Sequence, residues 1–363
     1  MKIAILSMQR VINYGSVLQA YSLKKIIEDI TGESVRFIDI DSTEKIPVSG
    51  TITTYQDYSE KGLSIRNAPW LIFRKLSHRS KKNKYVQMIK DFQQNELDLN
   101  KKYNHENYDL VVVGSDEVFI AAKYICLQLY GKIDNAQNVI TYAAASGMAQ
   151  VENISKIDIE TVRNALSNYK YMSVRDEHTK NYISELYNGD IQMHIDPVLA
   201  GELRKRNHKT VNRKPYLIVY AYAERIQDPV EVQAIKQYAK KKGLEIVCLG
   251  GQQLWADKFV PLSPFNMLDY FYNAECVVTD TFHGTVFSII NHCRFAVLKR
   301  KSNRFKIDGV LKIFGLSEHL IADIGNLQDI LEKEIDYNFV DSILEREGKR
   351  TREYLKQCIN SFR

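Results

Sequence analysis

The sequence predicts an α/β protein made of two Rossmann-like, doubly wound domains that face a cleft. Three observations predict this class: the length of 363 residues, short apolar runs alternating with helical patterns, and a polar break near the middle of the chain. At roughly 150 residues per domain, the length suits two domains, each large enough to bury its own core. Continuous apolar runs are typical of parallel strands that helices cover on both faces.

The expected first domain spans residues 1–200 and begins with a strand at 3–6. After a turn at 13–16, apolar residues recur at helical spacing from Val17 to Ile30, and the pair Thr31-Gly32 ends the helix. A second strand is expected at 35–38. Four further apolar runs predict strands buried on both faces, at 110–113, 139–142, 171–174 and 191–195.

Residues 202–214 are polar and basic without an apolar period, which suits a linker. The expected second domain, 201–340, has strands at 216–221, 244–249, 276–279 and 295–298, and one of its helices opens with Asp228 as cap and Pro229 in the first turn. Residues 341–363 predict a charged helix that packs back across the domains.

Doubly wound sheets bind ligands beyond the carboxyl ends of their strands, so the residues after each strand are the candidate site residues.

Composition excludes several classes of protein. Hydrophobic residues at 45% and charged residues at 26% are typical of a water-soluble globular chain. The net charge of +6 is too small to call for nucleic acid. The N-terminal apolar run is too short for a signal peptide and no run approaches the roughly 18 residues of a membrane span, so we expect a cytoplasmic protein. Five separated cysteines without a C-x-x-C pair predict reduced, mostly buried thiols and no metal site.

The most informative stretch is 279–288, where a strand, a tight turn and the start of a helix follow one another. Unpaired N–H groups and the positive end of the helix dipole make such a helix start a phosphate site, which would include Gly284 and Thr285. Gly284 would let the ligand approach the backbone. A His-Gly pair at this junction favours a functional His283 beside the phosphate over a histidine that only caps or packs.

Several short motifs, in one shared order, resemble the polysaccharide pyruvyl transferase family. The block TDTFHGTVFS at 279–288 is the most specific, and the others lie at 13–21, 113–116, 141–147, 173–176, 196–197 and 302–305. The resemblance implies a fold similar to that of GT-B glycosyltransferases. It also implies transfer of a pyruvyl group from phosphoenolpyruvate to two hydroxyls of a sugar as a cyclic ketal, with phosphoenolpyruvate as donor substrate and no cofactor.

The chain departs from the family pattern at two places. Glu117-Val118-Phe119 stands where the family usually continues Gly-Ser-Asp with Gln and Trp, and Cys293 stands where a Pro is common. These departures leave the chemistry intact but leave the identity of the acceptor sugar open.

The implied chemistry assigns roles to a few side chains. His283 titrates near neutral pH and is the expected acid/base group. Asp280 either orients its imidazole or accepts a hydroxyl proton, unless it is simply the helix cap. A donor with a phosphate and a carboxylate calls for arginines, and Arg175 and Arg304 lie near strand ends inside the family motifs, although an arginine on a surface loop is usually just solvated.

Two loops of the first domain are the expected acceptor site. Asn13 and Tyr14 follow the first strand, and Ser115 and Asp116 follow the strand at 110–113, so both loops would face the cleft and offer polar groups to sugar hydroxyls. Ordinary turn chemistry explains Asn13 and Ser115 at least as well. Asp116 is the stronger site candidate.

Segment 66–84 contains seven Lys or Arg residues, no acidic residue, and apolar Trp70, Leu71, Phe73 and Leu76. This pattern matches an amphipathic segment that lies on an anionic membrane surface, where a lipid-linked acceptor would be presented. It matches equally a solvated helix face whose aromatic residues pack on the first domain.

Two other functions stay open at this point. A GT-B glycosyltransferase that uses a nucleotide sugar needs the same two-domain cleft, and a catalytically silent glycan- or phosphate-binding protein could keep the scaffold. His283, Arg175 and Asp116 argue against the silent protein. Release of phosphate or of nucleotide by the purified protein separates the three.

Overall fold

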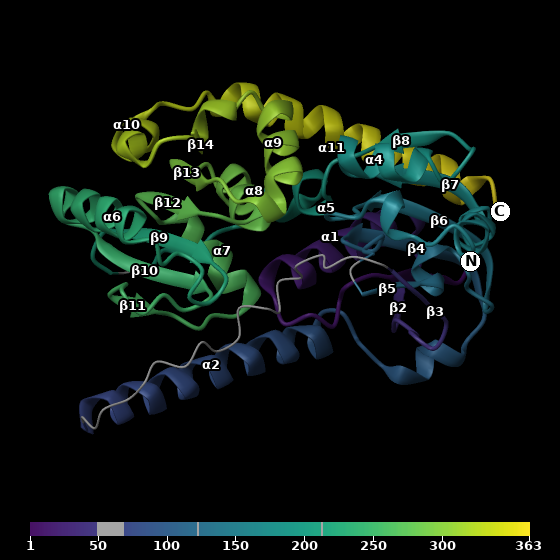
Figure 1. Ribbon diagram of the computed structural model, residues 1–363, viewed down its shortest axis with the longest axis horizontal. Helices are drawn as coiled ribbons and strands as arrows, with labels where there is room; N and C mark the ends of the chain where they lie inside the picture. The colour runs from purple at the N-terminus through teal and green to yellow at the C-terminus, as the bar shows by residue number, and fades with distance from the viewer. Residues whose placement is uncertain (49–68, 122, 212) are drawn as a thin grey trace.

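A computed structural model describes residues 1–48, 69–121, 123–211 and 213–363, with the backbone alone for 69–78. Two six-stranded sheets, parallel throughout, lie side by side with helices packed around them (Figure 1). This arrangement confirms the predicted class of two Rossmann-like domains.

The first sheet has the strand order β2-β1-β4-β6-β7-β8. In it Leu6 lies opposite Val113, so the loops that follow β1 and β4 leave the sheet at the same edge. Its strands are β1 (Ile3–Leu6), β2 (Arg36–Ile38), β4 (Tyr108–Asp116), β6 (Ala136–Ala144), β7 (Tyr169–Val174) and β8 (Ile191–Met193), and β3 (Lys45–Pro47) pairs with β5 (Tyr124–Cys126) outside it. Its helices are α1 (Tyr14–Thr31), α2 (Pro69–Asn95), α3 (Ile159–Leu166), α4 (Glu177–Ser184) and α5 (Pro197–Ala200).

The expectation that residues 191–195 form a strand buried on both faces was wrong. The strand β8 ends at Met193, and the side chains of Ile191, Gln192 and Met193 are half-buried or exposed. The reason is its place at the edge of the sheet, where β7 is its neighbour.

The second sheet has the order β11-β10-β9-β12-β13-β14, the doubly wound arrangement whose ligand crevice lies where the order reverses, between β9 and β12. Its strands are β9 (Tyr216–Ala221), β10 (Glu245–Gly250), β11 (Lys258–Phe259), β12 (Cys276–Thr279), β13 (Phe295–Leu298) and β14 (Leu320–Ile321). The helices are α6 (Pro229–Lys242), α7 (Pro264–Tyr272), α8 (Phe282–Ile290), α9 (Arg304–Ile313) and α10 (Leu327–Glu332). Asp228 caps α6 and Pro229 is its first residue, as predicted.

The first helix begins earlier than the apolar spacing predicts. Asn13, expected in a turn, is the N-cap, and its side chain accepts a hydrogen bond from the Gly15 N–H at 2.7 Å. The helix α1 therefore starts at Tyr14 and brings Tyr14, Gly15 and Ser16 into its first turn.

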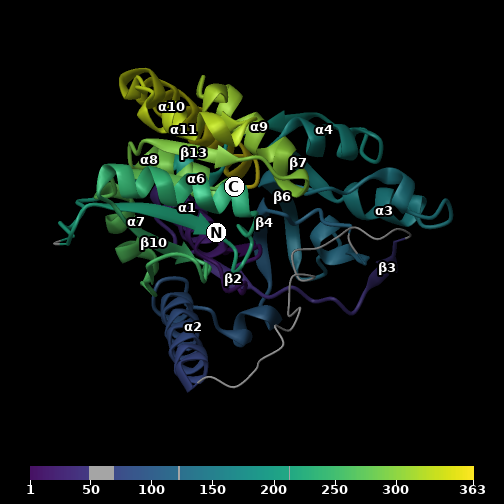
Figure 2. The same cartoon turned by 60° about the vertical axis from the view of Figure 1, so that its left-hand side comes forward.

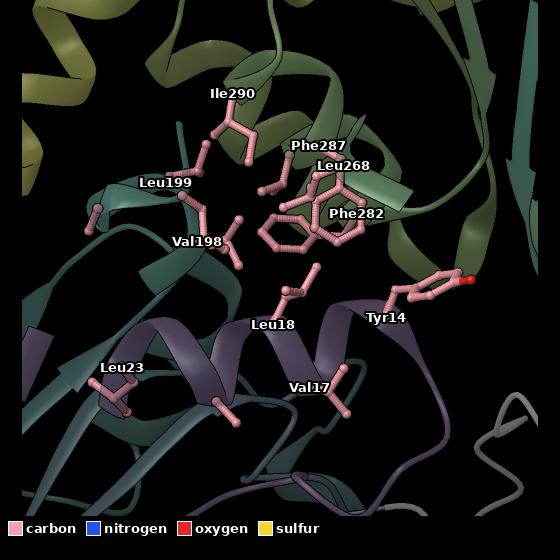
Figure 3. Close-up of a cluster of buried hydrophobic side chains, with 14 of the residues drawn as sticks. Tyr14, Val17, Leu18, Leu23, Val198, Leu199, Leu268, Phe282, Phe287 and Ile290 are labelled. Atoms are coloured by element: carbon pink, nitrogen blue, oxygen red, sulfur yellow. The ribbon is translucent and has the colours of Figure 1, made fainter. Parts of the chain in front are cut away.

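The apolar face of α1 packs directly on the second domain. Leu18 of α1 points toward Phe282 and Phe287 of α8 in one buried cluster (Figure 3). The Tyr14 hydroxyl donates to the carbonyl of Leu262 at 2.8 Å and accepts from the Leu262 N–H at 3.1 Å. A single apolar core thus continues from one domain into the other, which fixes the facing ends of α1 and α8.

Two long helices also join the domains. The helix α2 packs Tyr85 near Phe259 and Phe92 on Phe265, with ring centroids 6.4 and 5.2 Å apart. The helix α11 (Tyr337–Asn360) returns over the first domain (Figure 1), where Tyr354 donates to the Thr141 carbonyl at 3.0 Å. The expected boundaries near residues 200 and 340 stay predictions.

Candidate active site

Asp196 connects several candidate side chains at the junction of the two domains. Its Oδ2 atom accepts hydrogen bonds from Arg175 at 2.8 Å and from the Ser115 hydroxyl at 3.3 Å, and it lies 3.7 Å from Nε2 of His283. Its Oδ1 atom accepts from the Val198 N–H and so caps α5. The carboxylate is buried and three hydrogen bonds fix its position, while Nε2 of His283 lies beyond hydrogen-bond distance of it.

Arg175 follows β7 and is buried, with its guanidinium 4.3 Å from the centroid of the Phe282 ring of the other domain. One Nη donates to Asp196. Among the described residues, the Nε and the second Nη have no hydrogen-bond partner. Because leaving a buried guanidinium donor unsatisfied is costly, these N–H groups are suited to receive an anion that enters the site.

A small pocket adjoins the guanidinium. Polar and apolar groups line it: Arg175, Asp176, Asp196 and Lys306 together with Ile195, Leu199, Phe282, Val310 and Ile313. The pocket thus takes residues from both domains and has two permanent cations in its wall, and its volume of about 20 Å³ gives room for about one water molecule.

His283 lies at the start of α8, against the start of α1. A Cβ atom placed on Gly15 would lie 2.1 Å from Nδ1 of His283, so the imidazole occupies space that only a glycine leaves open. Burial lowers the pKa of His283, while the carboxylates of Asp196 and Asp116 act in the opposite direction. A neutral imidazole follows at neutral pH, which suits a base better than a resting acid.

Asp116 ends β4 and accepts a hydrogen bond from the Ser16 hydroxyl at 2.8 Å. Its φ of 77° places it in the left-handed region, which turns its side chain out of the strand direction. Burial raises the pKa of this carboxyl, but His283, Arg175 and Lys306 together bring it below its usual value. Asp116 is therefore ionised next to the imidazole.

The structure adds three residues that the sequence analysis did not predict as site residues. Asp196 was noted only as part of a motif, although its place before the helix-starting Pro197 is a capping signal. Lys306 and Glu117 form an ion pair between the two domains. No local pattern predicts that pair, because its partners come from different domains.

Asp280 has partners other than His283. Its Oδ2 atom lies 3.0 Å from Nε of Arg225 and 3.1 Å from Nε of Arg300, and Arg300 pairs with both carboxylate oxygens of Glu231. Burial raises the pKa of Asp280, although both arginines oppose this. Thr281, rather than Asp280, caps α8. Asp196, whose Oδ2 lies 3.7 Å from Nε2 of His283, is the carboxylate beside the imidazole, and a catalytic role for Asp280 stays a prediction.

The close approach expected at Gly284 is made by a neighbouring threonine. A Cβ on Gly284 would lie 2.0 Å from the Thr279 hydroxyl oxygen, and the Gly284 N–H donates to Thr281 at 2.9 Å. Thr285 is buried and donates to the Thr281 carbonyl. The space beside this glycine in the Cβ direction is thus filled from within the domain, and donor binding by Gly284 and Thr285 stays a prediction.

The remaining candidates lie apart from the pocket. Arg304 is exposed, with its guanidinium 4.5 Å from the Phe305 ring centroid. Asn13 caps α1 and Tyr14 is buried against Leu262. Donor or acceptor binding by these residues stays a prediction. Among the described residues, no group of three side chains that could hold a metal ion comes together.

Comparison with known proteins gives one family. The model of the polysaccharide pyruvyl transferase family matches residues 13–302, which include His283, Arg175 and Asp116. No curated protein sequence matches the chain.

Several solved structures are similar to this chain. A protein from Listeria monocytogenes assigned as a UDP-N-acetylglucosamine 2-epimerase has a TM-score of 0.51 at 12% identity, and the match covers 99% of this chain and 97% of that one. The UDP-GlcNAc 2-epimerase of Methanocaldococcus jannaschii has a TM-score of 0.49 at 13% identity, covering 93% of each chain. A glycosyltransferase from a Streptomyces species has a TM-score of 0.48 at 12% identity, covering 99% of each chain. At these identities the likeness concerns the fold alone.

Proposed function

The chain belongs to the polysaccharide pyruvyl transferase family, and we propose that it transfers pyruvate from phosphoenolpyruvate to two hydroxyls of a sugar. The product would be a cyclic pyruvate ketal on a glycan or glycan precursor, with release of phosphate. The observation that carries this proposal is the meeting of Arg175, Asp196 and Asp116 with His283 between the domains. These groups supply an anion site, an ionised carboxylate and a neutral base.

Arg175 and Lys306 are our proposed ligands for the donor. The donor carries a carboxylate and a phosphate, and a guanidinium with two N–H-bearing nitrogens open can pair with either group in a bidentate way. Lys306 lines the same pocket and adds a compact charge suited to phosphate oxygens.

The first half of the reaction joins one sugar hydroxyl to C2 of the donor. His283 takes the hydroxyl proton and passes it to the methylene carbon, which becomes the methyl group, and the deprotonated oxygen then bonds to C2, where positive charge has developed. Asp116 and Asp196 stabilise the imidazolium that exists in between, and Asp116 also faces the positive charge that develops at C2. The intermediate keeps its phosphate.

The second half closes the ring. The phosphate leaves C2 with the electrons of its C–O bond, the second hydroxyl attacks the same carbon, and its proton ends on the departing phosphate. Since both hydroxyls belong to one sugar, the second attack is intramolecular and needs only correct positioning. Our proposed acceptor site for these hydroxyls is Asp116 with the loops that carry Ser115, Asn13 and Tyr14.

The test is incubation of the purified protein with phosphoenolpyruvate, a panel of glycans and a panel of nucleotide sugars. Phosphate release that requires a glycan, with a glycan heavier by one ketal-linked pyruvate in mass spectrometry, would support the proposal. Release of nucleotide would instead identify a glycosyltransferase, and binding without turnover of any donor would identify a silent binding protein.

We also propose that the protein works in the cytoplasm, at the inner face of a membrane when its acceptor is lipid-linked. No helix in the part of the chain that the structure describes is long and apolar enough to span a membrane. Of the basic segment 66–84, residues 66–68 and the side chains of 69–78 lie outside the described residues. Arg79, Lys82 and Lys84 are exposed on α2, while Tyr85 of the same helix is buried.

A further inference from the structure

Glu117 and Lys306 form an ion pair from opposite sides of the site. Glu117 follows Asp116 in the first domain, and Lys306 lies in the first turn of α9 in the second domain. The two side chains are 17% and 7% exposed. A Cβ on Gly147 would lie 3.1 Å from the Glu117 carboxylate, so the chain also encloses this carboxylate from a second direction. The pair is therefore largely shielded from water.

The segment that carries Lys306 is held against the first domain at a neighbouring residue as well. Phe305 stacks on His178 of α4 with ring centroids 4.6 Å apart and an interplanar angle of 4°. Figure 2 shows α9 beside α4, over the junction of the domains. The start of α9 thus contacts the first domain twice, through the stacking of Phe305 on His178 and through the ion pair of Lys306 with Glu117.

The site holds more carboxylates than permanent cations. Arg175 and Lys306 face Asp116, Glu117 and Asp196, and burial keeps the nearby His283 largely neutral. Asp196 caps a helix and Asp116 accepts from Ser16, so both have structural tasks within the first domain. Glu117 instead neutralises the one lysine that lines the pocket.

We propose that Glu117 competes with phosphate for Lys306. Glu117 holds Lys306 in the empty site, yields it to the phosphate of the donor, and takes it back as inorganic phosphate leaves. Charges attract strongly where water is excluded, so a phosphate held by both Arg175 and Lys306 would leave slowly if Glu117 did not compete for the lysine. Glu117 thus speeds the release of inorganic phosphate at the expense of donor affinity. The inference rests on the proposed function.

The test compares Glu117→Gln, which keeps the shape and removes the charge, with the wild-type protein. We expect the Kd of phosphoenolpyruvate and that of inorganic phosphate, both measured by calorimetry, to fall on the order of tenfold. The KM for phosphoenolpyruvate should fall, and kcat should fall with it because phosphate release slows. If Glu117 had only a structural role, its replacement would not lower KM and kcat together and also lower the Kd of both anions.

Two variants keep the test specific. Glu117→Asp retains the charge and should bind both anions like the wild type. Glu245→Gln is the matched control, because Glu245 is also a largely buried carboxylate with basic partners, Arg213 and Lys258, but lies at the amino end of β10, away from the site. If Glu117→Gln does not fold, Glu117→Ala, which removes the charge together with most of the side chain, is measured in its place.

The outcomes separate this inference from the proposed function. The competition is overturned if folded Glu117→Gln binds both anions as the wild type does or more weakly. It is also overturned if Glu117→Asp or Glu245→Gln increases the affinity for both anions as much as Glu117→Gln does. If Glu117→Gln binds inorganic phosphate more tightly but no protein binds phosphoenolpyruvate, the competition between Glu117 and phosphate is supported and phosphoenolpyruvate is rejected as the donor. If the ketal forms and wild type and Glu117→Gln have equal KM and kcat, the proposed function is supported and the competition is rejected. Binding of neither anion by any of these proteins overturns both.

Discussion

Gly15 and His283 are in contact across the two domains, and a methyl group on Gly15 would lie 2.1 Å from Nδ1 of the imidazole. Each residue lies in the first turn of the helix that follows a strand, β1 in one domain and β12 in the other. The position of the proposed base thus depends on a residue of the other domain. The apolar packing of α1 on α8 maintains this contact.

Replacing Gly15 by Ala is therefore expected to displace His283 and to lower kcat by about ten- to a hundredfold, since small displacements of a reacting group are costly. The helix itself should tolerate Ala, which has the better helix propensity. The matched control is Gly309→Ala in α9, because a Cβ at Gly309 meets nothing within 4 Å. Equal kcat values for Gly15→Ala and wild type would contradict the proposed position of the base.

Replacing His283 by Gln should lower turnover by roughly two to four orders of magnitude, the usual contribution of a positioned acid/base group. Gln occupies a similar volume but does not take up a proton near neutral pH. Steady-state kinetics with matched circular dichroism spectra checks this, and a folded His283→Gln protein with a near-normal rate would remove His283 from the mechanism.

The burial of His283 predicts a low titration midpoint. In the free protein its imidazole should protonate only below the ordinary histidine pKa of about 6.5, because burial disfavours the charged form. Asp116→Asn should lower the pKa of His283 further, since the Asp116 carboxylate favours the imidazolium, and Lys306→Gln should raise it. NMR titration, with His283→Gln to assign the signal, measures all three, and a midpoint above 6.5 in the wild type would contradict the neutral base.

The loops of the site were predictable from the sequence, but their partners were not. Apolar runs followed by polar residues placed Arg175 and Asp116 at strand ends, where the structure has them, whereas His283, expected in a turn, lies in the first turn of α8. Nothing in the local pattern decides whether Asp280 or Asp196 lies beside the imidazole, because that depends on how the two domains dock. The ion pair of Glu117 with Lys306 escaped prediction for the same reason. The edge strand β8 was misjudged because apolar content alone does not distinguish an edge from a centre.

Arg175→Lys should weaken phosphoenolpyruvate binding by about ten- to a hundredfold, because a lysine cannot hold Asp196 and also offer a planar pair of N–H groups to the donor. Calorimetry measures this binding. Arg163→Lys in α3 is the control, since the Arg163 side chain is 49% exposed and belongs to a surface pair with Glu160. Normal donor affinity in Arg175→Lys would show that Arg175 does not clamp the donor.

The basic segment 66–84 yields a prediction about membranes. The exposed Arg79, Lys82 and Lys84 lie on α2, whose later residues Tyr85 and Phe92 contact the second domain. The start of α2 lies at the far end of the helix from β1 and β4 (Figure 1), so cations there can meet an anionic surface while the helix stays packed. Each Lys or Arg near such a surface contributes about 1 kcal/mol.

Vesicle flotation checks this prediction. The protein should float with vesicles that contain anionic lipid at low salt, and less so as salt screens the charges over the Debye length. Binding should drop when five cations become Gln, namely Arg74, Lys75, Arg79, Lys81 and Lys82. The control variant replaces Lys240 and Lys241, exposed lysines at the end of α6, and should still float. Because the proposed donor residues Arg175 and Lys306 line a pocket that takes no residue from segment 66–84, the five-Gln variant should turn over a water-soluble acceptor normally. A wild-type protein that ignores anionic vesicles at low salt would leave segment 66–84 as an ordinary solvated helix face.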